Sequence, residues 1–343
     1  MKNMEDFFTN LQNILLLIAS VNNWYEAPLV HFGLTNKSYI KFRNSDIRIP
    51  VYKGHREGWQ KVIGLTRLRH SQKLVKDGDL YRVCLKESGE LSPPLSLDEL
   101  CSMYYDLAEF LKLINAGASF SNDILKLNFF PKRPSFKIDI WSEMPRCLYQ
   151  TYYARFYDRF LPGGVEDKTI IDIGAYIGDT AIYFALLGAK QVIAFEPYPR
   201  LYRILLENVK LNNLCDHVEA KNVAVWGGFG EMKLRMPLGA YSIYKSAGAS
   251  ILSDGQIIAD VPIIPLEEAL HDSEVDVVKM NCEGCEFPAI MSADKRTLKK
   301  VNTFIIQIHE EYKVRSFKMM TKLREAGFKV IHAFGEFYLA TKM

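Results

Sequence analysis

From residue 168 onward, short apolar segments alternate with amphipathic segments of helical length. This alternation is typical of a parallel sheet with helices on both faces. It predicts strands at residues 169–173, 191–195, 218–225, 275–280 and 303–308. Two further apolar segments, 329–334 and 337–341, are separated only by Gly335 and Glu336, so they predict a terminal antiparallel pair. We therefore expect the α/β class, with a Rossmann-like sheet that is mostly parallel and a last strand that is antiparallel.

The residues before this segment have a different pattern. A chain of 343 residues exceeds the size at which one core usually stops growing, so two domains are expected. Apolar periodicity predicts secondary structure in four places: a helix at 7–18, strands at 38–42 and 47–52, and a helix at 95–111. We expect an N-terminal α+β accessory region, residues 1–145, that shapes substrate access or oligomer contacts, and a second domain, residues 146–343.

Two segments of the second domain interrupt the regular alternation. Residues 149–161 are rich in aromatic side chains and predict a helix that ends at Pro162. Residues 227–256 are rich in glycine and predict a strand-poor insertion between the third and fourth strands. Insertions on the loop side of such a sheet tend to build substrate pockets, so we expect this one to contribute to a pocket.

The strand at 169–173 runs into a glycine turn and then into a helix, which is the context of a nucleotide site. Gly174 permits a tight turn and close approach of the backbone to a ligand, and the helix N-terminus favours an anion. A dinucleotide fold would need a second glycine close behind Gly174, so the spacing favours S-adenosylmethionine (SAM), whose methionine carboxylate is the anion, over NAD. The expected cofactor contacts in this segment are Asp172, Gly174, Ala175, Tyr176, Gly178, Asp179 and Thr180.

Glu196 ends the next apolar strand, about twenty residues beyond the glycine turn. A carboxylate at this position can accept hydrogen bonds from both ribose hydroxyls of a nucleoside. An acidic residue at the end of a strand is by itself more often a solvated surface group. Together with the glycine turn, however, Glu196 and the adjacent Pro197 predict the ribose side of the SAM site.

Polar side chains follow the buried strand at 275–280, at the sheet edge where open α/β sheets bind ligands. We expect Asn281 to contact the methionine part of SAM. Glu283 and Glu286 are expected to orient or deprotonate an acceptor hydroxyl, although carboxylates at a helix N-terminus are also stabilised by its dipole. His309 ends the fifth strand at the same edge. Because the acceptor must lose a proton during methyl transfer, we expect Glu283 or His309 to be the base, and a purely structural histidine remains open.

The sequence gives only weak indications of a metal site and of a role for its cysteines. Asn281, Glu283, His309 and Glu310 offer oxygen and nitrogen ligands that leave Mg²⁺ assistance open, but no metal is assigned. Six cysteines are scattered through a chain large enough to fold without disulfides, so we expect free or buried thiols in a reducing, cytoplasmic compartment. Cys282 and Cys285 form a lone C-x-x-C motif, which predicts neither a zinc site nor a redox role.

The chain resembles the FkbM family of SAM-dependent methyltransferases in three motifs: Asp172-Ile-Gly-Ala-Tyr-Ile-Gly-Asp, Phe195-Glu-Pro and Lys279-Met-Asn-Cys-Glu-Gly-Cys-Glu. The resemblance covers about residues 165–341. It implies a class I SAM-methyltransferase fold and O-methylation of a hydroxyl, often on a sugar, glycolipid or polyketide-like molecule. Two positions depart from the family, which usually has Asn where Tyr176 stands and Asp where Asn281 stands.

Net charge and hydropathy limit which acceptors and partners the chain can have. The net charge of +3 is far from the single-sign field of a dedicated nucleic-acid binder, so a small-molecule or glycan acceptor is expected. The locally basic stretch 53–76, with Arg67 and Arg69, leaves an RNA methyltransferase as one alternative. A non-catalytic SAM-binding protein is the other. The apolar segment 14–21 is too short to span a bilayer, and a homo-oligomer stays open.

Overall fold

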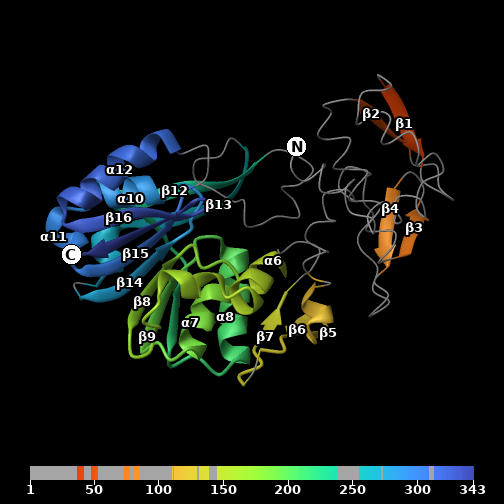
Figure 1. Cartoon of the computed structure of the whole chain (residues 1–343), viewed down its shortest axis with the longest axis horizontal. Helices are drawn as coiled ribbons and strands as arrows, with labels where there is room; N and C mark the ends of the chain where they lie inside the picture. Colours follow the sequence, from red (N-terminus) through yellow and green to blue (C-terminus); the bar gives the residue numbers. More distant parts are fainter. Residues whose placement is uncertain are drawn as a thin grey trace. The chain divides into compact units, whose positions relative to one another are not determined.

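The computed structural model describes residues 37–41, 48–52, 73–77, 80–84, 110, 112–129, 131–138, 145–237, 255–271, 273–308 and 313–343 (Figure 1). The chain divides into two units, residues 1–111 and 112–343, and each is described by itself. None of the helices in the described part of the chain has the length and hydropathy of a membrane span.

The first unit contains two antiparallel strand pairs. These are β1 (Lys37–Lys41) with β2 (Arg48–Tyr52), and β3 (Lys73–Asp77) with β4 (Leu80–Cys84). The strands predicted at 38–42 and 47–52 are thus confirmed to within one residue. The helix predicted at 7–18, nearly all of that at 95–111, and most of the basic stretch 53–76 lie outside the described residues.

The second unit is built on a seven-stranded sheet. Its strands follow the order β10 (Val218–Lys221), β9 (Gln191–Phe195), β8 (Thr169–Ile173), β14 (Val275–Met280), β15 (Val301–Gln307), β17 (Phe337–Lys342) and β16 (Phe328–Phe334). The first five strands are parallel, and β17 is antiparallel to both of its neighbours. This is the class I methyltransferase sheet, as predicted.

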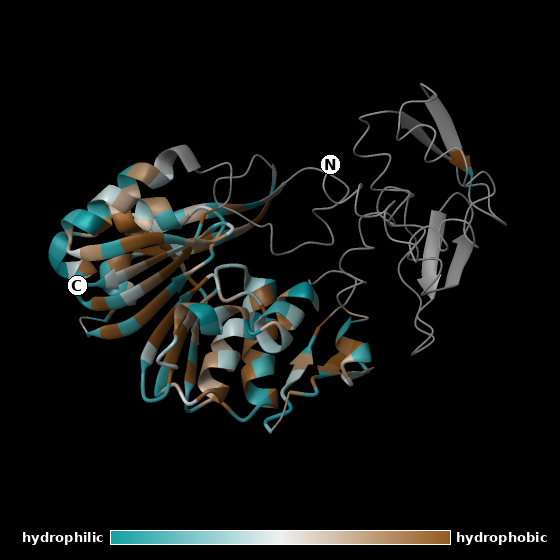
Figure 2. Cartoon of the chain, in the orientation of Figure 1, coloured by the Kyte–Doolittle hydropathy of each residue, from teal (hydrophilic) through white to brown (hydrophobic). Residues whose placement is uncertain are grey.

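Helices cover both faces of this sheet (Figure 1). The helices α7 (Asp179–Leu186) and α8 (Pro199–Leu211) lie on one face, and α10 (Glu286–Ser292) and α12 (Lys313–Glu325) lie on the other. Two short helices, α9 (Leu266–Ala269) and α11 (Lys295–Leu298), complete the second layer. Figure 2 shows that the central strands are mostly apolar along their length, as expected for strands buried on both faces.

The predicted strand-poor insertion is wrong, because its two ends form strands. Residues 224–226 leave the main sheet and pair as β11 (Ala224–Trp226) with β13 (Gly255–Pro265), which also pairs with β12 (Gly230–Pro237). The signal was present in β12, where Lys233 and Arg235 alternate with apolar residues at the period of a half-buried strand. The single strand predicted at 218–225 is accordingly two strands in two sheets.

The predicted helix at 149–161 is also replaced by shorter pieces. They are α6 (Pro145–Leu148), a π-helical turn η1 (Tyr149–Tyr153) and a 3₁₀ helix η2 (Phe156–Phe160). Arg155 between the last two has φ 47°, a left-handed conformation that ends a right-handed helix. The π turn brings both Thr151 and Tyr152 against the start of α7, where their hydroxyls donate to Asp179.

A three-stranded sheet packs on α8 of the same unit. It consists of β5 (Ser119–Ser121), β6 (Ile124–Lys126) and β7 (Ser135–Lys137). Asn208 on α8 and Asn212, which directly follows the helix, each accept a hydrogen bond from a β7 N–H and donate to the carbonyl of the same residue. The two amides thus satisfy backbone groups of β7 as a neighbouring strand would.

Candidate active site

The glycine turn after β8 has no room for a side chain. Gly174 has φ +78°, and a Cβ built on it would lie 2.1 Å from the carbonyl oxygen of Asn281. The N–H groups of Gly174 and Ala175 both donate to the carbonyl oxygen of Phe195, at 3.0 Å. The turn is therefore wedged between the carboxyl ends of β14 and β9, and its backbone faces the cavity at the sheet edge.

A buried ion pair lies beneath this turn. The Lys279 ammonium is 2.8 Å from Asp172 Oδ1 and donates to the carbonyl oxygen of Gly174 at 2.9 Å. The hydroxyl of Thr180 donates to the other oxygen of Asp172 at 2.5 Å. Asp172 does not line the cavity. Its contacts with Lys279 and Thr180 instead hold the glycine turn in place. Sequence analysis gave Lys279 no role, although a lysine within a buried apolar strand was a signal for one.

Glu196 reaches the cavity with both carboxylate oxygens held. Oε2 accepts a hydrogen bond from the Tyr176 N–H and Oε1 one from the Tyr198 N–H, each at 2.9 Å. The Asn222 side chain fixes the backbone by donating to the carbonyl oxygens of Glu196 and Pro197. Burial raises the pKa of Glu196 to about 7, although the two N–H donors lower it. The carboxylate therefore changes its charge near neutral pH.

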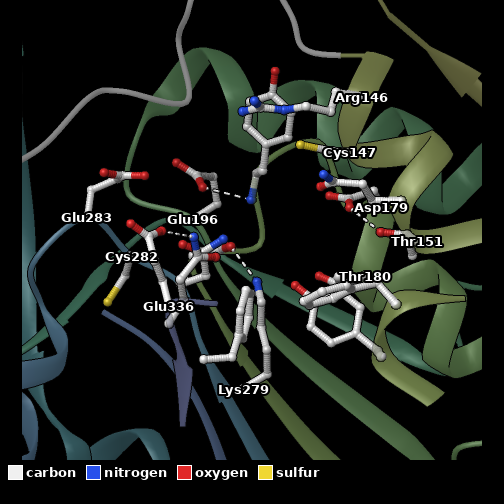
Figure 3. A pocket seen from close by; sticks show the side chains of 18 of the residues that line it. Arg146, Cys147, Thr151, Asp179, Thr180, Glu196, Lys279, Cys282, Glu283 and Glu336 are labelled. Carbon is white, nitrogen blue, oxygen red and sulfur yellow. Dashed lines mark hydrogen bonds between the residues drawn. The ribbon is translucent and has the colours of Figure 1, made fainter. Parts of the chain in front are cut away.

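Asp179 is a second buried carboxylate of the cavity. Its Oδ2 accepts a hydrogen bond from the Thr151 hydroxyl at 3.0 Å. Burial raises the pKa of Asp179 to about 6, against the lowering effect of nearby Lys279. Figure 3 shows Asp179 and Thr151 on one side of the cavity and Cys282 and Glu283 on the other.

The loop after β14 brings Asn281, Cys282 and Glu283 to the cavity. Glu283 has φ 56°, which turns the chain sharply. Glu286 does not line the cavity, because its oxygens accept hydrogen bonds from the Cys282 and Gly284 N–H groups at 2.9 and 3.0 Å. The amide oxygen of Asn281 is buried and has no hydrogen-bond partner among the described residues.

The expectation of free thiols is wrong for the two cysteines of this loop. Cys282 and Cys285 form a disulfide, with Cα atoms 5.5 Å apart. The spacing alone did not predict this bond, because it depends on the left-handed turn at Glu283 and Gly284. Cys215 is a free, exposed cysteine.

The cavity itself has a volume of about 540 Å³ (Figure 3). The predicted site residues that line it are Gly174, Tyr176, Asp179, Thr180, Glu196, Pro197, Asn281 and Glu283. Ala175 and Gly178 support the turn without lining it. Residues that sequence analysis missed include Arg146, Gln150, Thr151, Phe156, Tyr198, Lys279, Gln307, Glu336 and Phe337.

Two of the sequence hypotheses fall partly outside the described residues. His309 and Glu310, predicted as a base and as a possible metal ligand, are not described. In the described ranges, no three histidine, cysteine or acidic side chains come together in a way that could hold a metal ion.

The order of the sheet and the glycine turn after β8 are those of a class I SAM-dependent methyltransferase. Residues 172–330 match the sequence model of the Methyltransferase FkbM domain, and the chain belongs to the FkbM methyltransferase family.

Three relatives show how far the similarity extends. Uncharacterized protein 158B of Sulfolobus islandicus rod-shaped virus 1 is 30% identical over 179 residues, which are 52% of this chain and 81% of the viral protein. Methyltransferase sdnD of Sordaria araneosa is 22% identical over 191 residues, covering 47% of this chain and 73% of its own. Ribosomal protein L11 methyltransferase of Citrifermentans bemidjiense is 36% identical over 70 residues, or 20% of this chain and 23% of that enzyme.

Proposed function

We propose that the chain transfers the methyl group of SAM to a hydroxyl oxygen of a sugar, a glycolipid or another small molecule. The observation that carries this proposal is the charge of the cavity. Among the described lining residues are four carboxylates and two cations: Asp179, Glu196, Glu283 and Glu336, and Arg146 and Lys279. Because the Lys279 charge is already paired with Asp172, this lining favours a neutral acceptor over a polyanion such as RNA.

The residues of the cavity fit SAM in two respects. Each Glu196 oxygen accepts one backbone N–H and retains a lone pair for a ribose hydroxyl. The buried amide oxygen of Asn281, which lacks a partner among the described residues, matches a donor such as the methionine ammonium. When bound, SAM supplies a methyl group on a positively charged sulfur, which reacts by in-line displacement.

The remaining task of the chain is to orient the acceptor oxygen and to remove its proton. We assign proton removal to Glu283, since its carboxylate lines the cavity two residues beyond Asn281. Glu286 then acts as a positioning residue, because its hydrogen bonds to the Cys282 and Gly284 N–H groups hold the loop that carries Glu283.

The test combines cofactor binding with methyl transfer. Calorimetry measures the affinity for S-adenosylhomocysteine (SAH), and transfer of labelled methyl groups is measured on fractionated glycan, lipid and RNA pools. Glu283→Gln is expected to lower transfer by about 10²–10⁴-fold while SAH affinity stays unchanged. Glu274→Gln, an exposed position at the opposite end of β14, is the matched control.

The outcomes separate the alternatives. Label in the glycan or lipid pool supports the proposal, and label confined to RNA favours the RNA alternative. Tight SAH binding without transfer into any pool favours a non-catalytic SAM-binding protein. If Glu283→Gln keeps full activity, the base assignment to Glu283 is wrong and His309→Gln is the next variant.

A further inference from the structure

The antiparallel strand β17 brings a turn to the edge of the sheet where the cofactor site lies. Gln307, at the end of β15, pairs in register with Phe337 at the start of β17. The N–H of Ile308 donates to the carbonyl oxygen of Glu336 at 2.9 Å, so the backbone of the β16–β17 turn is fixed to the end of β15. Gln307, Glu336 and Phe337 consequently line the same cavity as Glu196 and Asn281.

Two planar polar groups lie side by side on this wall. The side-chain amide of Gln307 donates to Glu336 Oε2 at 3.1 Å, and both side chains are half-buried. An amide offers two N–H donors and one carbonyl acceptor, and a carboxylate accepts more than one hydrogen bond. Adjacent amide and carboxylate groups therefore match two neighbouring hydroxyl groups, each of which both donates and accepts.

Aromatic rings flank the polar pair. The Phe337 ring lies 4.7 Å from Phe156 at 62° and 5.5 Å from Phe160 at 27°, measured between centroids. Phe156 and Phe337 line the cavity. Rings held by such packing present fixed apolar surfaces beside a polar pair. That combination suits a ligand with an apolar C–H face and hydroxyls at its rim.

We propose that the end of β15 and the β16–β17 turn form the acceptor subsite, in which Gln307 and Glu336 bind neighbouring hydroxyls of a neutral pyranose whose C–H face packs on Phe156 and Phe337. This inference rests on the proposed function, because it names the acceptor class of the same cavity. The four carboxylates of the lining disfavour an acidic sugar or a sugar phosphate.

Saturation-transfer NMR on the SAH-saturated full chain tests the inference. The probes are methyl glycosides of mannose, galactose, glucose and fucose. At least one glycoside is expected to receive saturation at its ring C–H protons. Gln307→Ala and Glu336→Gln are each expected to weaken its binding about tenfold, while SAH affinity by calorimetry stays within about twofold. Gln191→Ala, at an exposed glutamine that begins β9 at the end of the strand away from the cavity, should leave both unchanged.

The possible results are distinct. Absence of saturation for all four glycosides on SAH-bound protein overturns the subsite, and so does glycoside binding that survives both substitutions. Either outcome overturns only the sugar subsite. Methyl transfer to the hydroxyl of another small molecule would still agree with the proposed function. Failure of the wild-type chain to bind SAH overturns the proposed function and this inference with it.

Discussion

The ammonium group of Lys279 lies 2.8 Å from the carboxylate of Asp172, and the two residues are directly paired across the neighbouring strands β14 and β8. Their side chains are only 3% and 0% exposed. Since the same ammonium also donates to the Gly174 carbonyl oxygen, one buried charge joins the strand that carries Asn281 to the turn that faces the cofactor. The glycine turn and the loop carrying Glu283 thus depend on this pair, of which Lys279 lines the cavity and Asp172 lies beneath it.

Lys279→Met is therefore expected to destabilise the fold as well as the site. The substitution keeps an unbranched apolar side chain but removes the ammonium group, so the Asp172 carboxylate stays buried without its counter-ion. We expect the free energy of unfolding to fall by about 3–5 kcal/mol, measured by urea unfolding followed by tryptophan fluorescence.

Lys233→Met provides the control for this effect. Lys233 pairs with Asp260 at 3.4 Å, but both side chains are 56% exposed, so the loss should be at most about 1 kcal/mol. A loss for Lys279→Met as small as that for Lys233→Met would show that the buried pair does not hold the turn. Asp172→Asn added to Lys279→Met should recover part of the loss, because the orphaned charge is then removed.

The affinity for SAH should depend on pH through Glu196. Burial raises its pKa to about 7, and the ribose hydroxyls donate best to the ionised carboxylate. Below pH 7 binding must release a proton, so affinity is expected to rise up to about tenfold per pH unit towards pH 7 and to level off above it. Calorimetry between pH 5.5 and about 8.5, in buffers of different ionisation enthalpy, measures both the slope and the proton release.

Glu196→Gln should remove most of this slope and lower SAH affinity at pH 8 by about 10–100-fold, because a charged acceptor is lost. Glu219→Gln, at a half-exposed side chain on the neighbouring strand β10, should keep the wild-type profile. An affinity that is flat across this range in the wild-type chain would contradict the ribose role of Glu196. Asp179, with a pKa of about 6, accounts for any slope that Glu196→Gln retains below that pH.

The stability of the ligand-free chain should have the opposite pH dependence. The pKa of Glu196 is about 7 in the folded chain and 4.5 as its ordinary value, so between these values only the folded chain holds the proton. The protonated Glu196 carboxyl therefore makes its full contribution to the free energy of unfolding below pH 4.5. About 3 kcal/mol of this contribution is lost as the pH rises to about 7. Urea unfolding at pH 5 and pH 8 should show a smaller difference in Glu196→Gln than in the wild type. An equal difference in both chains would mean that the buried carboxyl does not titrate as described.

The sequence predicted those features of the fold and site that depend on neighbouring residues. Continuous apolar runs such as 192–195 mark strands buried on both faces, and Gly174 and Glu196 follow their strands directly. The Gln307–Glu336 pair was not predictable in this way, because the two residues are 29 positions apart and meet only through the insertion of β17. Thr151 likewise reaches Asp179 only because a π turn replaces the predicted helix. Local pattern therefore predicted the glycine turn and Glu196, whereas the wall formed by Gln307 and Glu336 arises from long-range packing.

Among glycine-to-alanine changes in the described residues, Gly174→Ala should have the largest effect on SAH binding. The added Cβ would lie 2.1 Å from the Asn281 carbonyl oxygen, and the φ of +78° is strained for alanine. Since the obstacle is backbone, the turn or the end of β14 must move, and both carry the cofactor site. We expect the free energy of unfolding to fall by at least about 2 kcal/mol and SAH binding to be undetectable by calorimetry. Gly228→Ala meets nothing within 4 Å and should behave as the wild type in both measurements. Retention of SAH affinity in Gly174→Ala would show that the cofactor does not bind against this turn.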